Sequence, residues 1–171
     1  MARRSWSRWA EGYALSEPDP AAAVPILDRP LAIAESADIT WVTVNCRRAL
    51  AHVHTQLGNN TEALELALDS VRAYRRQGAW AHVWNDLFYV AIAVEALGDA
   101  ASAARLLGGV STSAVAGVER VQRLGRELEQ RLAGELGEAT AANLMDEGRR
   151  LTPQQAVELA EAAAAQLVSS G

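Results

Sequence analysis

The sequence predicts an all-α fold built from antiparallel helical hairpins that recur about every 40 residues. A turn signature recurs at a fixed step, because Asp19, Asn59 and Asp99 are each 40 residues apart. The segments between these turns place apolar residues three and four apart, as one buried face of an α-helix requires. No segment of useful length shows the alternation of apolar and polar residues that a half-buried strand would have.

The expected turns carry residues that end one helix and begin the next. Gly58 and Gly98 suit the left-handed position that closes a helix. Asn60 or Thr61, and Asp99, have side-chain oxygens that can accept hydrogen bonds from the free amides of a new helix. Each repeat is therefore expected to be a helix, a turn of two or three residues, and an antiparallel helix.

The positions of these turn residues give the expected bounds of the helices. Trp41 and Trp80 lie near the starts of successive first helices, 39 positions apart, and give a second marker of the repeat. Pro30 lies inside an expected helix and removes a backbone hydrogen bond there, so we expect a kink or a break near Asp28. The predicted helices cover residues 3–15, 20–36, 38–57, 60–77, 79–97 and 99–109.

The C-terminal part breaks the repeat rhythm. A polar run after Gly109 predicts a linker near residues 111–114. Thr152, Pro153 and Gln155 have the pattern of a capping box with proline at the first helical position, so they open the last helix. The helices between are expected near residues 115–135 and 138–148.

A helical array needs an atypical end that covers the exposed face of its last repeat. We therefore divide the chain into helical repeats over residues 1–112, with an incomplete first repeat, and capping helices over residues 113–171. The resulting fold is a solenoid of helical hairpins of the tetratricopeptide type with a C-terminal helical cap.

Composition narrows the classes of partner. The 171 residues are half hydrophobic, and the net charge is −5 with an isoelectric point near 5.2. A nucleic-acid surface needs a concentrated basic patch, whereas Arg120, Arg123 and Arg131 lie among acidic residues and are interpreted as a solvated helix face. No direct contact with nucleic acid is expected. No segment has the apolar length to span a membrane, and the single Cys46 suits a reducing cytoplasm.

The sequence offers no recognisable catalytic or metal site. His52 and His54 are two residues apart, so on a helix they diverge by roughly 200° and cannot share a metal as residues three or four apart would. The Gly108–Gly109 pair lacks the strand and the spacing of a dinucleotide-binding loop. Cys46 falls on an apolar stripe and is expected to be a buried core residue. We expect no enzymatic activity, no cofactor and no metal.

The aromatic side chains suggest a binding surface. All five tryptophans, all three tyrosines and the single phenylalanine lie before residue 90. Trp80, Trp84 and Phe88 stand four apart and so share one stripe of a helix. One interpretation packs this stripe between neighbouring helices. The other places Trp84 and Phe88 in a groove with Trp41 and Arg48 of the preceding repeat, because aromatic and arginine side chains often anchor partners.

Three stretches near the C-terminus carry a family resemblance: residues 103–109 (AARLLGG), 135–139 (ELGEA) and 146–157 (DEGRRLTPQQAV). With them the chain resembles the C-terminal tetratricopeptide-like region of large bacterial ATP-binding regulators of the LuxR and related types. The similarity covers most of the chain and is strongest from residue 97 onward. It implies an array that receives inducers or partner proteins. The chain has no phosphate-binding loop, and the ATPase and DNA-binding modules of such regulators are expected to lie outside it.

Our leading hypothesis is a non-catalytic sensor or protein-interaction region of a bacterial transcriptional regulator, binding a partner protein or inducer through a helical-repeat groove. The alternative is a free-standing adaptor of tetratricopeptide type that holds a peptide. A third class is an enzyme with a small helical domain, including a metal-dependent one. The partner is therefore expected to be a protein or peptide, or a small inducer, and its identity and the oligomeric state are left open. The first expected helix matches only the end of a repeat's first helix, so we interpret the chain as a piece of a longer protein.

Overall fold

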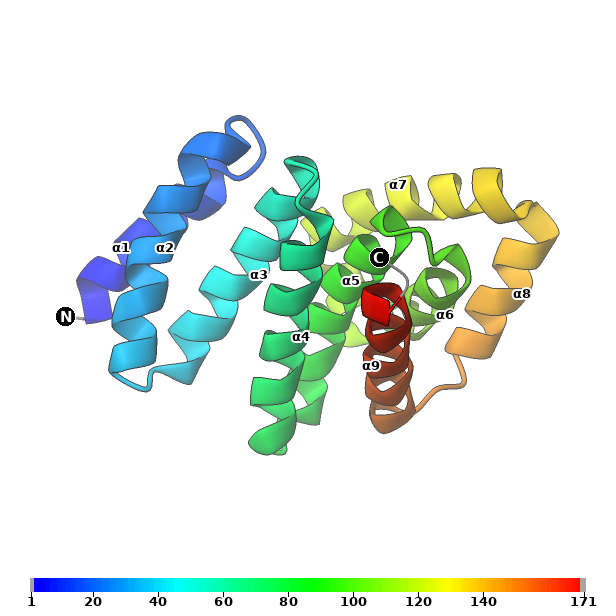
Figure 1. Cartoon of the computed structure of the whole chain (residues 1–171). Helices are drawn as coiled ribbons and strands as arrows, with labels where there is room; N and C mark the ends of the chain where they lie inside the picture. The colour runs from blue at the N-terminus through cyan, green and yellow to red at the C-terminus, as the bar shows by residue number, and fades with distance from the viewer. Residues whose placement is uncertain (1, 170–171) are drawn as a thin grey trace.

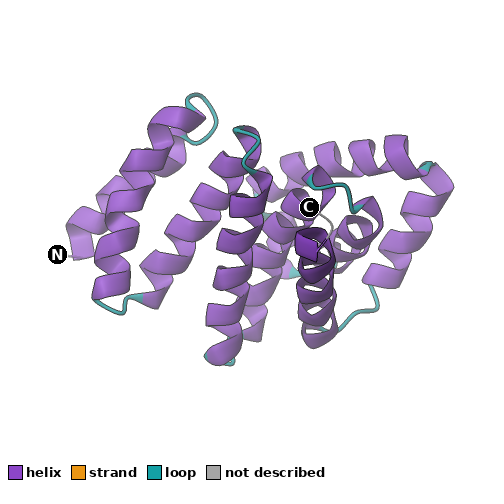
Figure 2. Cartoon of the chain, viewed as in Figure 1, coloured by secondary structure: helices purple, strands orange, loops and turns teal. Residues whose placement is uncertain are grey.

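The structure, a computed structural model, describes residues 2–169. Within that range the chain is helical throughout, with connecting loops and no strand (Figure 2). This confirms the predicted all-α class and is consistent with a helical-repeat fold. The elements are α1 (Ala2–Leu15), α2 (Pro20–Ser36), α3 (Thr40–Gln56), α4 (Asn60–Arg76), α5 (Trp80–Ala96), α6 (Ala100–Ser111), the 3₁₀ turn η1 (Ala114–Gly117), α7 (Glu119–Leu136), α8 (Glu138–Gly148) and α9 (Pro153–Ser169).

The turns that join α2 to α6 share one geometry. Gly58, Gly78 and Gly98 have φ angles of 79°, 68° and 97°, and Asp38 takes the same place with a φ of 52°. These left-handed residues recur every 20 positions, which is half of the predicted repeat. The amide of the residue that follows each of them bonds to a carbonyl five positions earlier, as Asn59 does to His54 at 2.8 Å. The predicted helix-closing role of Gly58 and Gly98 is confirmed.

The predicted helix caps are confirmed at two of three places. The carboxylate of Asp99 accepts a hydrogen bond from the Ser102 amide at 3.0 Å. Thr152 and Gln155 exchange the two bonds of a capping box, at 2.9 and 3.2 Å. The assignment to Asn60 or Thr61 is wrong, because both lie inside α4 and the cap position belongs to Asn59, whose side chain makes no capping bond.

Of the kink or break expected near Pro30, the break does not occur, since α2 continues through Pro30 to Ser36. The packing of α2 against α1 and α3 explains why the helix continues. Pro30 is buried, and Leu27 sits so close to α1 that a Cβ on Gly12 would lie 2.6 Å from its Cγ. Contacts with α1 and α3 hold the helix together where one backbone hydrogen bond is lost. The other departure is at α7, which begins at Glu119 because residues 114–117 form η1.

Each helix from α1 to α6 packs against the one before it, and α1, α3 and α5 also contact one another in sequence. The largest buried cluster is centred on α5 and α6, and it extends into α9. Figure 1 shows α9 in front of α5 and α7 behind it, with α8 beside α6. Cys46 is buried, as predicted, and burial raises the pKa of its thiol to about 12.

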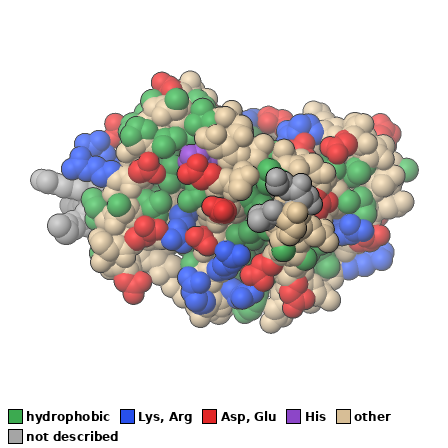
Figure 3. Space-filling view, in the orientation of Figure 1, with side chains coloured by type: hydrophobic (Ala, Val, Ile, Leu, Met, Phe, Trp, Pro, Cys, Tyr) green, Lys and Arg blue, Asp and Glu red, His purple; other side chains and the backbone are tan. Residues whose placement is uncertain are grey.

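No helix in residues 2–169 combines the length and apolar character needed to cross a bilayer. The face seen in Figure 3, formed by α2, α4 and α9, mixes acidic, basic and apolar side chains without a large area of one charge.

Candidate interaction face

The side chains of α1, α3 and α5 form a face that α7 covers. We call this the inner face. Two open cavities, of about 420 and 200 Å³, lie between it and α7. The residues of the inner face that line the cavities are Trp9, Tyr13, Glu17, Asn45, Arg48, Ala49, His52, Thr55, Gln56, Asn85, Tyr89, Ile92, Glu95 and Ala96.

Glu17, in the turn between α1 and α2, holds the N-terminal end of α7. Its Oε1 lies 3.1 Å from Nε of Arg120 and also pairs with Arg123. The guanidinium of Arg120 lies over the ring of Tyr13, 3.8 Å from its centroid, and donates a hydrogen bond to the Ser16 hydroxyl at 3.2 Å. Arg120 and Arg123 therefore connect this end of α7 to the turn after α1 through ion pairs with Glu17, and Arg120 adds a hydrogen bond and a cation–π contact.

Glu95, near the end of α5, holds the other end of α7. Its two carboxylate oxygens accept hydrogen bonds from Nε and Nη2 of Arg131 at 2.7 and 3.0 Å. This two-pronged geometry is the strongest form of an arginine–carboxylate pair. The hydrogen bonds raise the pKa of Arg131 above its ordinary value.

His52 lies between the two anchors at the wall of the larger cavity. Its Nε2 is 2.7 Å from the amide nitrogen of Gln56 and 3.9 Å from Oε1 of Glu17. Burial, followed by the positive charge of Arg120, lowers the pKa of His52 to about 4, and Glu17 offsets this only in part. The imidazole is therefore neutral at neutral pH and adds no charge to the inner face.

A buried ion pair joins α3 to α5 beside the smaller cavity. Nε of Arg48 donates to Oδ1 of Asp86 at 2.8 Å, and Nη1 donates to Oδ1 of Asn45 at 3.2 Å. Burial raises the pKa of Asp86 to about 6, although Arg48 acts in the opposite direction. Within the described residues, Oδ2 of Asp86 accepts no hydrogen bond. Removing either partner would leave an uncompensated buried charge, which is strongly destabilising.

An apolar stripe of α7 faces the body of the protein. Val121, Leu128 and Leu132 are buried. Gly125 lies on the same stripe, and a Cβ built on it would be 3.9 Å from both Cε2 of Phe88 and Cδ1 of Leu107. The helix thus presents one apolar edge to α5 and α6 and one arginine-bearing edge to the inner face.

The four side chains predicted to bind a partner do not lie together in one groove. Trp41 is 51% exposed, and its ring centroid lies 6.4 Å from that of Trp9. Arg48 is on the inner face, but its guanidinium group already forms an ion pair with Asp86. The placement of Trp84 and Phe88 in an open groove is wrong, because both are buried. The packed interpretation of these two side chains is the correct one.

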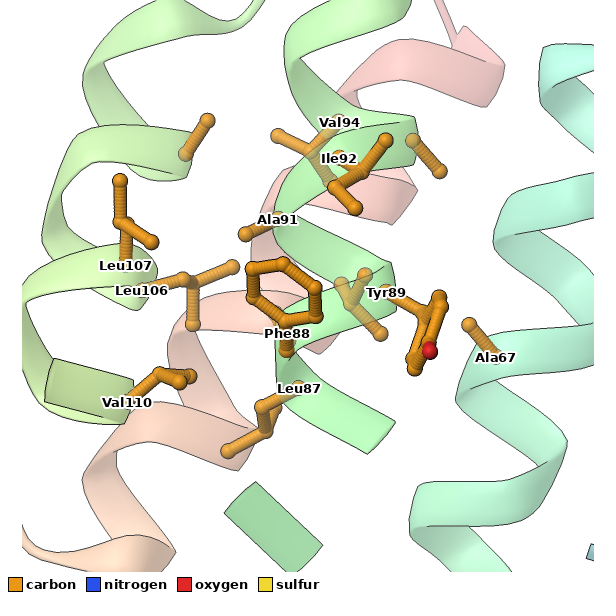
Figure 4. Close-up of a cluster of buried hydrophobic side chains, with 14 of the residues drawn as sticks. Ala67, Leu87, Phe88, Tyr89, Ala91, Ile92, Val94, Leu106, Leu107 and Val110 are labelled. Carbon is orange, nitrogen blue, oxygen red and sulfur yellow. The ribbon is translucent and has the colours of Figure 1, made fainter. Parts of the chain in front are cut away.

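The two buried aromatics lie in different places. Trp84 packs against Gly109, where a Cβ would lie 2.6 Å from the indole ring. Phe88 is fully buried, and Figure 4 shows its ring among Leu87, Leu106 and Leu107. Gly125 of α7 lies close to that ring, so α7 forms part of its cover.

The sequence interpretation missed the contribution of α7. It described Arg120, Arg123 and Arg131 as a solvated face, whereas these three side chains pair with Glu17 and Glu95 of the helical array. Their helical spacing, which places them along one edge, was the available signal. Their acidic counterparts lie 36 or more positions away in sequence, which no local pattern reveals.

Among the described residues, no group of three or more His, Cys, Asp or Glu side chains is arranged to hold a metal ion. Comparisons of the chain with protein-family models, with curated proteins and with solved structures find no match.

Proposed function

We propose that this chain is a non-catalytic protein-interaction region, with α1–α6 as a tetratricopeptide-like array and α7–α9 as its cap. The inner face is the binding surface. One observation carries the proposal: carboxylates at both ends of this face already hold a helix by its arginines. A surface that accepts a helix within its own chain has the shape and charge to accept one from a partner.

Residues 103–109, 135–139 and 146–157 resemble the corresponding stretches of bacterial LuxR-type regulators. This resemblance supports a role for the protein-binding region within a regulator of that type. In that setting the array is the sensor or interaction region of a transcriptional regulator in the cytoplasm, and binding shifts the regulator between states. The single buried thiol of Cys46 suits a reducing compartment. ATP hydrolysis and DNA binding would belong to other modules.

A photocrosslinking experiment tests the binding surface. Gln56→p-benzoylphenylalanine places a crosslinker on the inner face, and Glu65→p-benzoylphenylalanine places one on the exposed side of α4 as a matched control. Each variant is produced in the native host at the natural level and irradiated. A defined protein adduct from position 56 that is absent from position 65 is expected. Identical adducts from both positions, or none from position 56, would contradict the proposal.

A further inference from the structure

We propose that α7 occupies the inner face as a replaceable internal ligand, and that the partner is an amphipathic helix whose arginines pair with Glu17 and Glu95 in its place. This inference rests on the proposed function, that the inner face binds a protein. It adds the chemistry of the partner and the means by which the face is made available.

Charge complementarity defines the partner. The inner face offers a carboxylate at each end, Glu17 for Arg120 and Arg123, and Glu95 for Arg131. Positions 120 and 131 are about 16 Å apart along a helix at 1.5 Å per residue. A partner helix that carries arginines at these spacings can make the same pairs. His52, lying between the two carboxylates, stays neutral and repels neither end of such a helix.

The contacts of α7 are of a kind that a competitor can replace. The side chains of Arg123 and Arg131 remain 43% and 48% exposed in their ion pairs. Exposed pairs such as Arg123–Glu17 contribute little to stability and are weakened by salt, whereas the two-pronged Arg131–Glu95 pair is the stronger one. Only Val121, Leu128 and Leu132 among the 18 residues of α7 are buried.

Open cavities lie on both sides of α7. The cavity of about 420 Å³ lies on its arginine-bearing side. A second cavity of about 340 Å³ lies on the opposite side, between α7, the end of α6 and Met145 of α8. At Gly125 the helix presents no side chain to Phe88 and Leu107, where a methyl group would make ordinary contact. A partner with a side chain at that position gains apolar contact that α7 lacks.

The connections of α7 allow it to undock while α8 stays packed against α6, and undocking uncovers Phe88 and the other apolar side chains beneath α7. It is joined to α6 through residues 112–118 and to α8 through Gly137. The helix α8 is held separately, by close backbone packing of Gly108 and Gly148 against α8 and α6 respectively. The chain between α6 and α8 is long enough to loop out while both ends stay in place. Once undocked, a single helix of this length is marginally stable in water.

A peptide of residues 118–137 of this chain, with a fluorescent label, serves as the probe. The host for it is the full chain with Arg120→Glu, Arg123→Glu and Arg131→Glu, which weakens its own α7 but leaves Glu17 and Glu95 intact. The control host carries Arg29→Glu, Arg126→Glu and Arg150→Glu, an equal charge change at exposed positions outside the three ion pairs. Fluorescence anisotropy gives the dissociation constants, and circular dichroism confirms that helix content is retained.

The triple variant is expected to bind the peptide at least 10-fold more tightly than the wild type or the control host, because its binding-competent state is more populated. A peptide with the same three Arg→Glu changes is expected not to bind. Equal binding to all hosts, or none to the triple variant, overturns the inference. A triple variant that forms dimers by exchanging α7, detected by light scattering, also overturns it, since the occupant would then be a second copy.

Hydrogen exchange on the wild type keeps the inference testable if the triple variant misfolds. An excess of peptide 118–137, isotopically labelled so that its fragments differ in mass, is expected to increase exchange at residues 119–136 and to leave α8 and α9 protected. No change at residues 119–136 contradicts the inference. If the position-56 crosslink still forms in that case, the interaction face stands and only the partner chemistry assigned to it is wrong.

Discussion

The C-terminal helices α7 and α8 contact the rest of the molecule in opposite ways. Helix α8 meets α6 backbone to backbone: a Cβ on Gly148 would lie 1.9 Å from the carbonyl oxygen of Arg105, and one on Gly108 would lie 2.1 Å from that of Met145. Helix α7 instead meets the inner face through long side chains, with cavities between. Because α7 also buries Val121, Leu128 and Leu132 in the main core, the two contacts differ in how much of each is made by charged side chains.

The two contacts also depend on different conditions. The α6–α8 packing relies on shape, so it tolerates salt and moderate acid but no added volume. The α7 contact combines the buried Val121, Leu128 and Leu132 with ion pairs and a neutral histidine, and the polar part of it responds to salt and pH. Each of the following changes acts on one contact and should leave the other intact.

The largest effect is expected from Gly148→Leu. No space exists for the side chain, so α8 must move away from α6. The free energy of unfolding should fall by about 3 kcal/mol or more, at the upper end of the cost of overpacking a core. Urea denaturation followed by circular dichroism measures it. The matched control is Gly134→Leu in α7, where a Cβ meets nothing within 4 Å. That control should be neutral or gain up to about 1 kcal/mol from helix propensity.

The fold of the array could be predicted because its information is local. Gly58 and Gly98 adopt a left-handed backbone at little cost, and their regular spacing indicated the turns. The break expected at Pro30 failed because its outcome depends on tertiary contacts. Leu27 and its neighbours hold α2 against α1 and α3, and a rule about one residue does not contain that packing.

Acid should weaken the α7 side of the molecule through His52. The pKa of His52 is about 4 in the folded chain and 6.5 when it is solvated, so the unfolded chain binds more protons between these values. Stability from this group is therefore complete above pH 6.5 and is lost as the pH falls toward 4. The loss is about 2 kcal/mol at pH 5.

His52→Gln is the control for this effect, because glutamine does not titrate. The buried Asp86, with its pKa raised to about 6, acts in the opposite sense, since its contribution falls as the pH rises. It is the same in both proteins and cancels in their difference. Urea denaturation of both at pH 8 and pH 5 gives the comparison. A pH dependence that is unchanged by His52→Gln would show that His52 titrates normally.

The ion pairs of α7 should affect the local opening of α7, whereas the ion pairs of α9 should not. Glu95→Gln removes the charge that holds Arg131, and Glu161→Gln removes the charge that α9 offers to Arg72 and Arg75 of α4. Glu95→Gln should lower the free energy of local opening of α7 by about 1 kcal/mol, as expected for a partly exposed pair. Hydrogen exchange at residues 119–136 measures this opening.

Under the same conditions, Glu161→Gln should leave α7 protection unchanged. The effect of Glu95→Gln should also shrink when salt is raised from 0.05 to 0.5 M, because screening weakens the Glu95–Arg131 ion pair in the wild type and the variant has no such pair to lose. Equal exchange of α7 in the two variants would mean that the Arg131 pair contributes nothing to docking.

The candidate site was harder to predict than the fold for a reason that these pairs illustrate. Phe88 could be assigned to a helix stripe from sequence, but whether that stripe was open depended on where α7 lies. That position depends on the buried Val121, Leu128 and Leu132 and on ion pairs with Glu17 and Glu95, which belong to segments far from Arg120 and Arg131 in the chain. Spacing along one helix predicts which side chains share an edge, and only the tertiary structure shows what that edge meets.

The smallest effect, and the sharpest comparison within α7, is expected from Gly125→Ala and Gly134→Ala. Both replace glycine in a helix, which should add up to about 1 kcal/mol of stability. Only the methyl group at position 125 reaches Phe88 and Leu107, so this variant should gain a few tenths of a kcal/mol more from contact. Hydrogen exchange of α7 in both variants gives the difference. If Gly125→Ala instead loosens α7, the helix sits closer to Phe88 than the structure places it, and the inner face has no room for a bulkier partner.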